Sequence, residues 1–271
     1  LTAVNASINP ILGIAIPILC SLLGSLLMGL LYCFLTVNLR ANQNVTGLAM
    51  TTFGVGFGNF FGGSLSSLFG EGGSISLIRT GACFKATLPF ASKLGLFGDT
   101  FLSFGFLAYL AIVIALLCSW FLNRTRAGLS LRAVGESPAT ADAAGINVTK
   151  YKYLATCIGA AIAGLGGLYF IMDYIGGAWT NGGFGDRGWL AIALVIFALW
   201  KPKYSILGSI LFGGLYIVYL YIPGLSRSSQ EIFKMLPYVV TIVVLIVLSI
   251  RNRRENQPPE SLGLSYFRED R

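Results

Sequence analysis

Few side chains in this sequence could carry out catalysis. The 271 residues include no His, which excludes Ser-His-Asp and Cys-His triads, histidine zinc sites and histidine proton relays. The five Cys lie mostly within apolar stretches and show no C-x-x-C spacing, so we interpret them as small core side chains. The phosphate-binding pattern G-x-x-x-x-G-K-S/T is absent as well. The sequence therefore predicts no catalytic residue, no metal site and no cofactor bound by the chain itself.

The chemistry that remains is neutral and consists of aromatic rings and amides set among glycines. Asn59, flanked by Phe57 and Phe60, stands in the middle of a glycine-rich apolar run. Such groups either pack and anchor helices, or they line a path for a flat, neutral, hydroxylated molecule. Asp173, near the end of another run, is either interfacial or a hydrogen-bond partner for a hydroxylated substrate. The candidate pathway residues are Phe53, Phe57, Asn59, Phe60, Asp173, Trp179, Asn181 and Phe184.

The composition indicates the kind of element that must position these residues. Hydrophobic residues make up 55% of the chain, charged residues 11%, and the mean hydropathy is +0.75. A soluble domain carries about 25% charged residues. The net charge of +8 is scattered between apolar runs, unlike the basic patch of a nucleic-acid binder. An ordinary soluble enzyme, a disordered chain and a nucleic-acid-binding protein are excluded, and an integral membrane protein is predicted.

Uncharged runs mark the predicted membrane spans. A helix needs about 20 apolar residues to cross about 30 Å of hydrocarbon. The runs are 11–37, 41–70, 101–122, 153–172, 188–200, 204–226 and 235–250. Residues 71–99 are predicted to be an external, non-spanning excursion with short interfacial helices, because Arg79, Lys85 and Lys93 would each cost roughly 2.5–3.5 kcal/mol at a helix centre. We predict a single all-α transmembrane domain over 1–271, with about 7–9 transmembrane helices, some short or broken.

Glycines recur within the spans. Gly54, Gly58 and Gly62 repeat every four residues in the second run. This spacing indicates either close helix packing or a helix that is broken beside a substrate path.

The Lys and Arg distribution predicts the orientation. If 11–37 runs from outside to inside, 13 of the 19 Lys and Arg lie on the cytoplasmic side and six outside. This bias places the tail 251–271 in the cytoplasm.

The cytoplasmic loop 123–152 contains a predicted short helix. Ser137 followed by Pro138 is a helix start, and Gly145 is a typical stop just after a helix. The helix over 138–144 is too short to be stable alone, since isolated helices below about 12–15 residues are marginal in water. Its surface is almost entirely Ala, so we expect a groove of a partner to hold it rather than its own chain. An ordinary connecting loop is the alternative.

These residues resemble a known family. The string LRAVGESPATADAAGI resembles the cytoplasmic coupling loop of bacterial ABC-importer permeases of the branched-chain amino acid, ribose and nucleoside type. FLTVNLRANQNVTGLAM, GDRGWLAIALVIFALWKP and PPESLGLSYFREDR are also similar to that family, and within it the chain looks most like permeases paired with basic-membrane-protein-type nucleoside lipoproteins. The family's N-terminal N-I-G-x-E-G-type motif is not found: either the chain is truncated or it departs from the pattern there.

The resemblance implies a passive permease subunit of an ATP-driven importer. The implied partners are a second permease, identical or homologous, ABC ATPase subunits that use ATP and Mg²⁺, an extracytoplasmic substrate-binding lipoprotein, and the lipid of the bacterial inner membrane, with no nucleic acid polymer. The implied substrate is a nucleoside, with simple sugars such as ribose as the alternative, and an ion-coupled secondary carrier is the rival from another class. The implied ATPase-coupling residues are Arg132, Gly135, Glu136, Ser137, Pro138, Ala141, Asp142, Ala144 and Gly145.

Overall fold

The computed structural model describes residues 10–69, 77–85, 103–180, 182–185, 187–224, 226–251 and 257–267. Every regular element longer than a single bridge in these ranges is helical. The chain divides into two compact units, which are described separately. Unit 1 comprises 1–111, 137–184 and 263–271, and unit 2 comprises 112–136 and 185–262.

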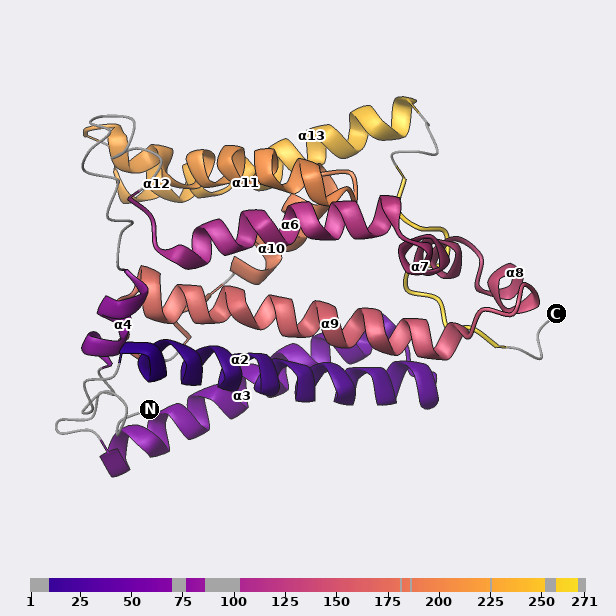
Figure 1. Ribbon diagram of the computed structural model, residues 1–271. Coiled ribbons are helices and arrows are strands. Elements are labelled where there is room, and N and C mark those ends of the chain that lie inside the picture. Colours follow the sequence, from indigo (N-terminus) through magenta and orange to yellow (C-terminus); the bar gives the residue numbers. More distant parts are fainter. Residues whose placement is uncertain are drawn as a thin grey trace. The chain divides into compact units, whose positions relative to one another are not determined.

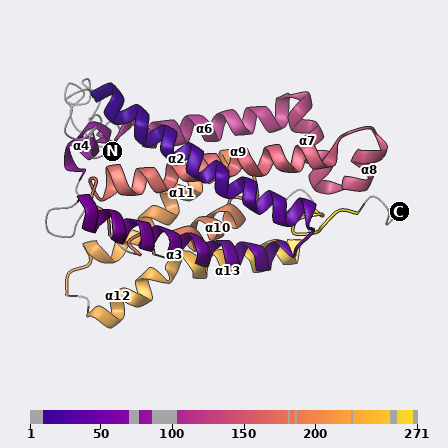
Figure 2. The same ribbon diagram turned by 90° about the horizontal axis from the view of Figure 1, so that it is seen from below.

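Unit 1 is built around two long helices that run antiparallel. Its elements are α2 (Pro10–Cys33), η1 (Phe34–Asn38), α3 (Gln43–Phe69), α4 (Ile78–Phe84), the start of α6 (Phe106–Arg124), α8 (Pro138–Ala143), α9 (Val148–Tyr169) and η3 (Phe170–Tyr174). Figures 1 and 2 show α2 and α9 side by side along most of their length.

Small residues let α2 and α9 approach closely. The hydroxyl of Ser21 donates to the carbonyl of Gly164 at 2.8 Å. A Cβ on Gly164 would overlap the side chain of Ser25, and a Cβ on Gly29 would lie 2.7 Å from the Cβ of Ala160. Because lipid supplies no hydrophobic drive between helices, such close packing is a main source of their association.

Both helices end in a π-helical turn. In η1, the amide of Leu39 donates to the carbonyl of Phe34 at 3.1 Å, five residues back. In η3, the amide of Ile175 donates to the carbonyl of Phe170 at 3.0 Å. At the η1 end, the hydroxyl of Tyr153 on α9 donates to the side-chain oxygen of Asn38 at 2.8 Å and ties the two helices together.

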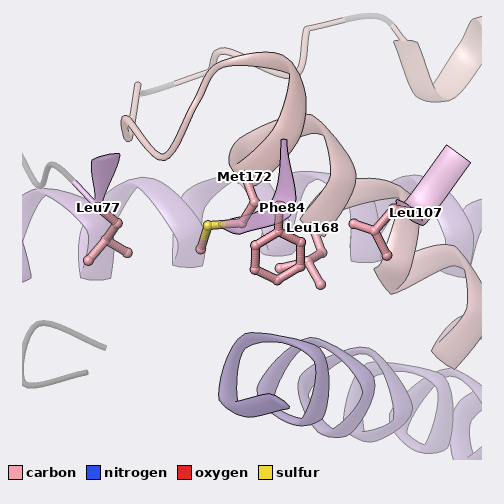
Figure 3. Close-up of a cluster of buried hydrophobic side chains, with 5 residues drawn as sticks. All are labelled: Leu77, Phe84, Leu107, Leu168 and Met172. Carbon is pink, nitrogen blue, oxygen red and sulfur yellow. The ribbon is translucent and has the colours of Figure 1, made fainter. Parts of the chain in front are cut away.

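The core of unit 1 lies at the η3 end. Leu77, Phe84, Leu107, Leu168 and Met172 form this cluster, which Figure 3 shows. Leu77 directly precedes α4 and Phe84 is its last residue; this helix of 7 residues is too short to cross a membrane. α4 packs into the core through Leu77 and Phe84, and the external, non-spanning position of residues 71–99 stays a prediction. Residues 71–76 and 86–99 lie outside the described residues.

Unit 2 holds the remainder of α6 and a second group of helices. These are α7 (Arg126–Glu136), α10 (Arg187–Phe197), α11 (Pro202–Ile217), η4 (Val218–Tyr221), α12 (Arg227–Lys234) and α13 (Leu236–Arg251). α10 packs against both α11 and α13. At one of these contacts the rings of Phe197 and Phe212 lie 5.2 Å apart, and Gly208 makes room for Phe197.

The helices confirm the predicted all-α polytopic membrane fold. Within the described ranges, five stretches are long and apolar enough to cross a membrane: Ile11–Asn38, Phe106–Arg124, Val148–Tyr174, Pro202–Tyr221 and Ser228–Val247. Two predicted runs are not among these five stretches. The run 41–70 forms α3, whose hydropathy is lowered by Gly, Asn and Thr, and the run 188–200 forms α10, which is short at 11 residues. Sequence reasoning gave no helix at α7 or α12.

Candidate functional site: a cavity beside α3 and the short helix α8

An apolar cavity in unit 1 brings together part of the predicted pathway. It has a volume of about 220 Å³ and is lined by α3, the end of α9 with η3, and residues 178–180 and 182–184. Asn59, Trp179 and Phe184 all line it. The amide oxygen of Asn59 accepts a hydrogen bond from the backbone amide of Gly182 at 3.3 Å, which links α3 to the loop beyond η3.

The glycine repeat of α3 makes room for Trp179. A Cβ on Gly62 would overlap the indole ring, with Cζ2 2.7 Å away, and a Cβ on Gly58 would lie 3.8 Å from the same ring. α3 runs without a break through these positions, so the alternative of a broken helix is wrong. The repeat instead forms a shallow groove that seats one aromatic side chain beside the cavity.

The phenylalanines of the predicted pathway do not all lie in this cavity. Phe53, Phe57 and Phe60 are at least half exposed on α3 and are not among its lining residues. Phe57 packs against Phe53 with ring centroids 5.7 Å apart, on an outward face. Phe184 packs edge-on against Phe170, with the two ring centroids 5.2 Å apart. Phe170 also lines the cavity, and the sequence analysis did not predict this. Asn181 lies outside the described residues.

Asp173 also lies outside the cavity lining. It belongs to η3, but its carboxylate faces Gly105, where a Cβ would overlap one carboxyl oxygen. That buried oxygen has no hydrogen-bond partner among the described residues. The structure therefore does not join Asp173 to Asn59 and Trp179.

The predicted short helix is present as α8, and both of its ends are capped. The hydroxyl of Ser137 accepts from the amide of Thr140, and Pro138 occupies the first helical position. At the other end, the amide of Gly145 donates to Asp142 and that of Ile146 to Ala141, both at 3.0 Å, which is the Schellman pattern. Gly145 has φ +83°, a conformation that suits glycine.

α8 packs on its own chain more than expected. Pro138 and Ala141 are buried, and the hydroxyl of Tyr266 donates to the carboxylate of Asp142 at 2.9 Å. The expectation that only a partner would hold this helix is therefore wrong. Sequence reasoning missed Tyr266 because the contact joins residues 124 positions apart. The other face of α8 remains exposed, with Ala139, Thr140, Ala143 and Ala144 on it.

The remaining predicted coupling residues belong to α7 in unit 2. The side chain of Arg132 is exposed and donates to the side-chain oxygen of Asn123 at 3.3 Å. The carbonyls of Gly135 and Glu136 accept hydrogen bonds from Ser261, through its amide and its hydroxyl respectively. Sequence reasoning overlooked α7, although Thr125 marks its start by accepting from the amide of Gly128 at 3.0 Å.

Within the described ranges, no three His, Cys, Asp or Glu side chains gather closely enough to hold a metal ion. The arrangement therefore offers two features: an aromatic and amide-lined cavity beside α3, and a capped short helix with one exposed small-residue face.

Comparison with known proteins places the chain in a family. Residues 1–245 match the family described as branched-chain amino acid transport system / permease component. This chain belongs to that family. It is a multi-pass membrane protein, and the resemblance that the loop 123–152 carried is confirmed.

Individual relatives match this permease over most of its length. It is 33% identical to a nucleoside ABC transporter permease protein, NupC, of Lactococcus lactis, over 89% of this chain and 76% of the relative. It is 30% identical to a guanosine ABC transporter permease protein, NupQ, of Bacillus subtilis, over 86% and 74%. It is 31% identical to a putative glucose ABC transporter permease protein of Haloferax volcanii, over 95% and 81%. No solved structure matches the chain.

Proposed function

We propose that this permease is the membrane-spanning subunit of an ATP-driven importer for nucleosides. The observation that carries the proposal is its similarity, over nearly the whole chain, to the nucleoside and guanosine permeases. The cavity beside α3 is consistent with such a substrate. A nucleobase is flat and can stack on rings such as Trp179 and Phe184, and the hydroxyls of a ribose can bond to an amide such as that of Asn59.

The energy source in this proposal lies outside the chain. The sequence has no G-x-x-x-x-G-K-S/T pattern, so separate ABC ATPase subunits would hydrolyse ATP with Mg²⁺. α8 would sit in a groove of the ATPase through its exposed face, since Ala139 and Ala143 are small and lie one turn apart. Motion of the ATPase would then move α8 as a rigid body and, through the short connection 144–147, α9.

The assembly and its orientation belong to the same proposal. A second permease, identical or homologous, would complete the pathway, and an extracytoplasmic lipoprotein would deliver the substrate. The excess of Lys and Arg supports a position of α8 and the C-terminal residues on the cytoplasmic side of a bacterial inner membrane.

The substrate is tested on the binding lipoprotein that works with this permease. Its melting temperature would be measured with guanosine, uridine, ribose and glucose. We expect nucleosides alone to raise it, because ligand that binds the folded state stabilises that state. A shift with glucose or ribose and none with nucleosides would favour the sugar importer, which the Haloferax relative makes the second candidate.

The coupling role of α8 is tested with a bulky residue on its exposed face. Ala143→Trp should reduce substrate-stimulated ATP hydrolysis by the reconstituted complex at least about fivefold, because overpacking costs about 1–3 kcal/mol. Ala111→Trp is the matched control, since Ala111 is exposed on α6 far along the chain from α8. Equal activity of both variants would contradict docking through α8.

Nucleoside uptake by the permease alone, without ATP, would favour a secondary carrier.

A further inference from the structure

The end of the chain contacts the part of unit 1 that carries α8. Residues 264–267 have no regular secondary structure, and we call them the C-terminal strap. The backbone carbonyl of Leu264 accepts from the side-chain amide of Gln43, at the start of α3, at 3.2 Å. The guanidinium of Arg40, between η1 and α3, lies 4.5 Å from the centre of the Phe267 ring.

A third contact reaches α8 itself. Between Leu264 and Phe267, the hydroxyl of Tyr266 donates to the carboxylate of Asp142 at 2.9 Å. A hydrogen bond to a charged carboxylate is stronger than one between neutral groups. The strap therefore joins α8 to the turn between η1 and α3, two segments that are about 100 residues apart in the sequence.

The strap contacts α8 at Asp142, which leaves the face of small residues on α8 exposed. Pro138, Ala141 and Asp142 face the chain, whereas Ala139 and Ala143 are exposed. A polar cavity of about 650 Å³ lies at this place and is lined in part by Arg40, Asp142 and Tyr266. This cavity lies beside Asp142, at the end of α8, so the hydrogen bond from Tyr266 is the contact that holds this end of α8 to the strap.

We propose that the C-terminal strap fixes the direction of α8, and that Tyr266 and Asp142 are positioning residues for energy coupling. The inference rests on the proposed function, since it takes α8 as the element that the ATPase moves. With the strap in place, displacement of α8 reaches the turn beside α3 as well as α9. Without it, α8 tilts into the cavity, and the ATPase turns over ATP without moving the pathway.

The test uses the complete complex in proteoliposomes and measures ATP hydrolysed per nucleoside taken up. Tyr266→Phe removes one hydroxyl and leaves the ring. We expect it to raise this ratio at least about tenfold, the effect of one lost hydrogen bond to a charged group. Tyr221→Phe is the matched control, because Tyr221 is 78% exposed in η4, and it should keep the wild-type ratio.

A double-mutant cycle separates positioning from a general loss of structure. Asp142→Ala should raise the ratio as much as Tyr266→Phe, and the double variant should be no worse than either single variant. Hydrogen exchange of the α8 amides in the isolated permease should speed up in Tyr266→Phe and not in Tyr221→Phe. A wild-type ratio and wild-type exchange in Tyr266→Phe, or additive effects in the cycle, would overturn the inference.

The two proposals fail in different ways. If Ala143→Trp abolishes stimulated hydrolysis while Tyr266→Phe changes nothing, the strap proposal is wrong and coupling through α8 stands. If the wild-type complex shows no nucleoside-stimulated hydrolysis, the proposed function is wrong, whatever the exchange data show for the strap.

Discussion

The contact between the Trp179 ring and Gly62 of α3 gives a quantitative prediction. Gly62→Ala places a methyl group where the indole ring lies, with Cζ2 2.7 Å from the new carbon. Overpacking of this kind costs about 1–3 kcal/mol. Alanine also gains about 0.5–1 kcal/mol over glycine inside a helix. The net expectation is a loss of stability of up to about 2 kcal/mol and displacement of the ring towards the cavity of about 220 Å³.

Gly56→Ala in the same helix is the matched control. Nothing lies within 4 Å of a Cβ at Gly56, so this variant keeps the helical gain without the clash. The difference between the two variants then equals the overpacking cost alone, about 1–3 kcal/mol. At about 2–4 °C per kcal/mol for a domain of 150–250 residues, the apparent melting temperature of Gly62→Ala in detergent should be lower by several degrees than that of Gly56→Ala.

A second substitution tests whether Trp179 is the cause. Trp179→Leu removes the ring, so adding Gly62→Ala to that variant should cost little. Nucleoside uptake in proteoliposomes should fall in Gly62→Ala and not in Gly56→Ala, if the cavity is part of the pathway. Equal melting temperatures for the two glycine variants, or a full cost of Gly62→Ala in the Trp179→Leu background, would refute this account of α3.

Three further predictions concern helix packing and caps. Gly164→Val should lower stability by about 1–3 kcal/mol through overlap with α2, whereas Gly166→Val, with open space around it, should not meet this clash; apparent melting temperatures decide between them. Ser137→Ala should cost α8 about 1 kcal/mol of local stability by removing its N-cap, measured as faster amide exchange in α8. Gly145→Ala should cost roughly 1–2 kcal/mol because of the left-handed backbone there, and exchange as slow as in wild type would count against both cap assignments.

Local features of the sequence were enough to predict much of the molecule. The uncharged runs coincide with helices because the backbone in hydrocarbon must satisfy its own hydrogen bonds. α8 was predictable from Ser137, Pro138 and Gly145, since caps act through neighbours a few residues away. The coupling role assigned to this segment stays a prediction.

Long-range pairings were beyond sequence reasoning. Nothing local to Gly62 indicates that Trp179 occupies the space beside it, and nothing local to Asp142 indicates a hydrogen bond from Tyr266. The repeat of small residues on α3 allows several packings, and only the partner helix or loop decides among them. For the same reason the predicted pathway set was partly separated: Asn59 and Trp179 meet at one cavity, and Asp173 does not.

The π-helical turns at the ends of α2 and α9 set the angular phase of the next residues along the chain. A π turn contains one residue more than an α-helical turn, and each residue rotates a helix by about 100°. Leu39, directly after η1, and Ile175, directly after η3, are therefore rotated relative to an uninterrupted α-helix. Deleting a single residue from either π turn would change the direction of only the segment that follows it and would leave the packing of α2 against α9 unchanged. The direction of the chain at each end of this helix pair can therefore be altered independently, in evolution or by design.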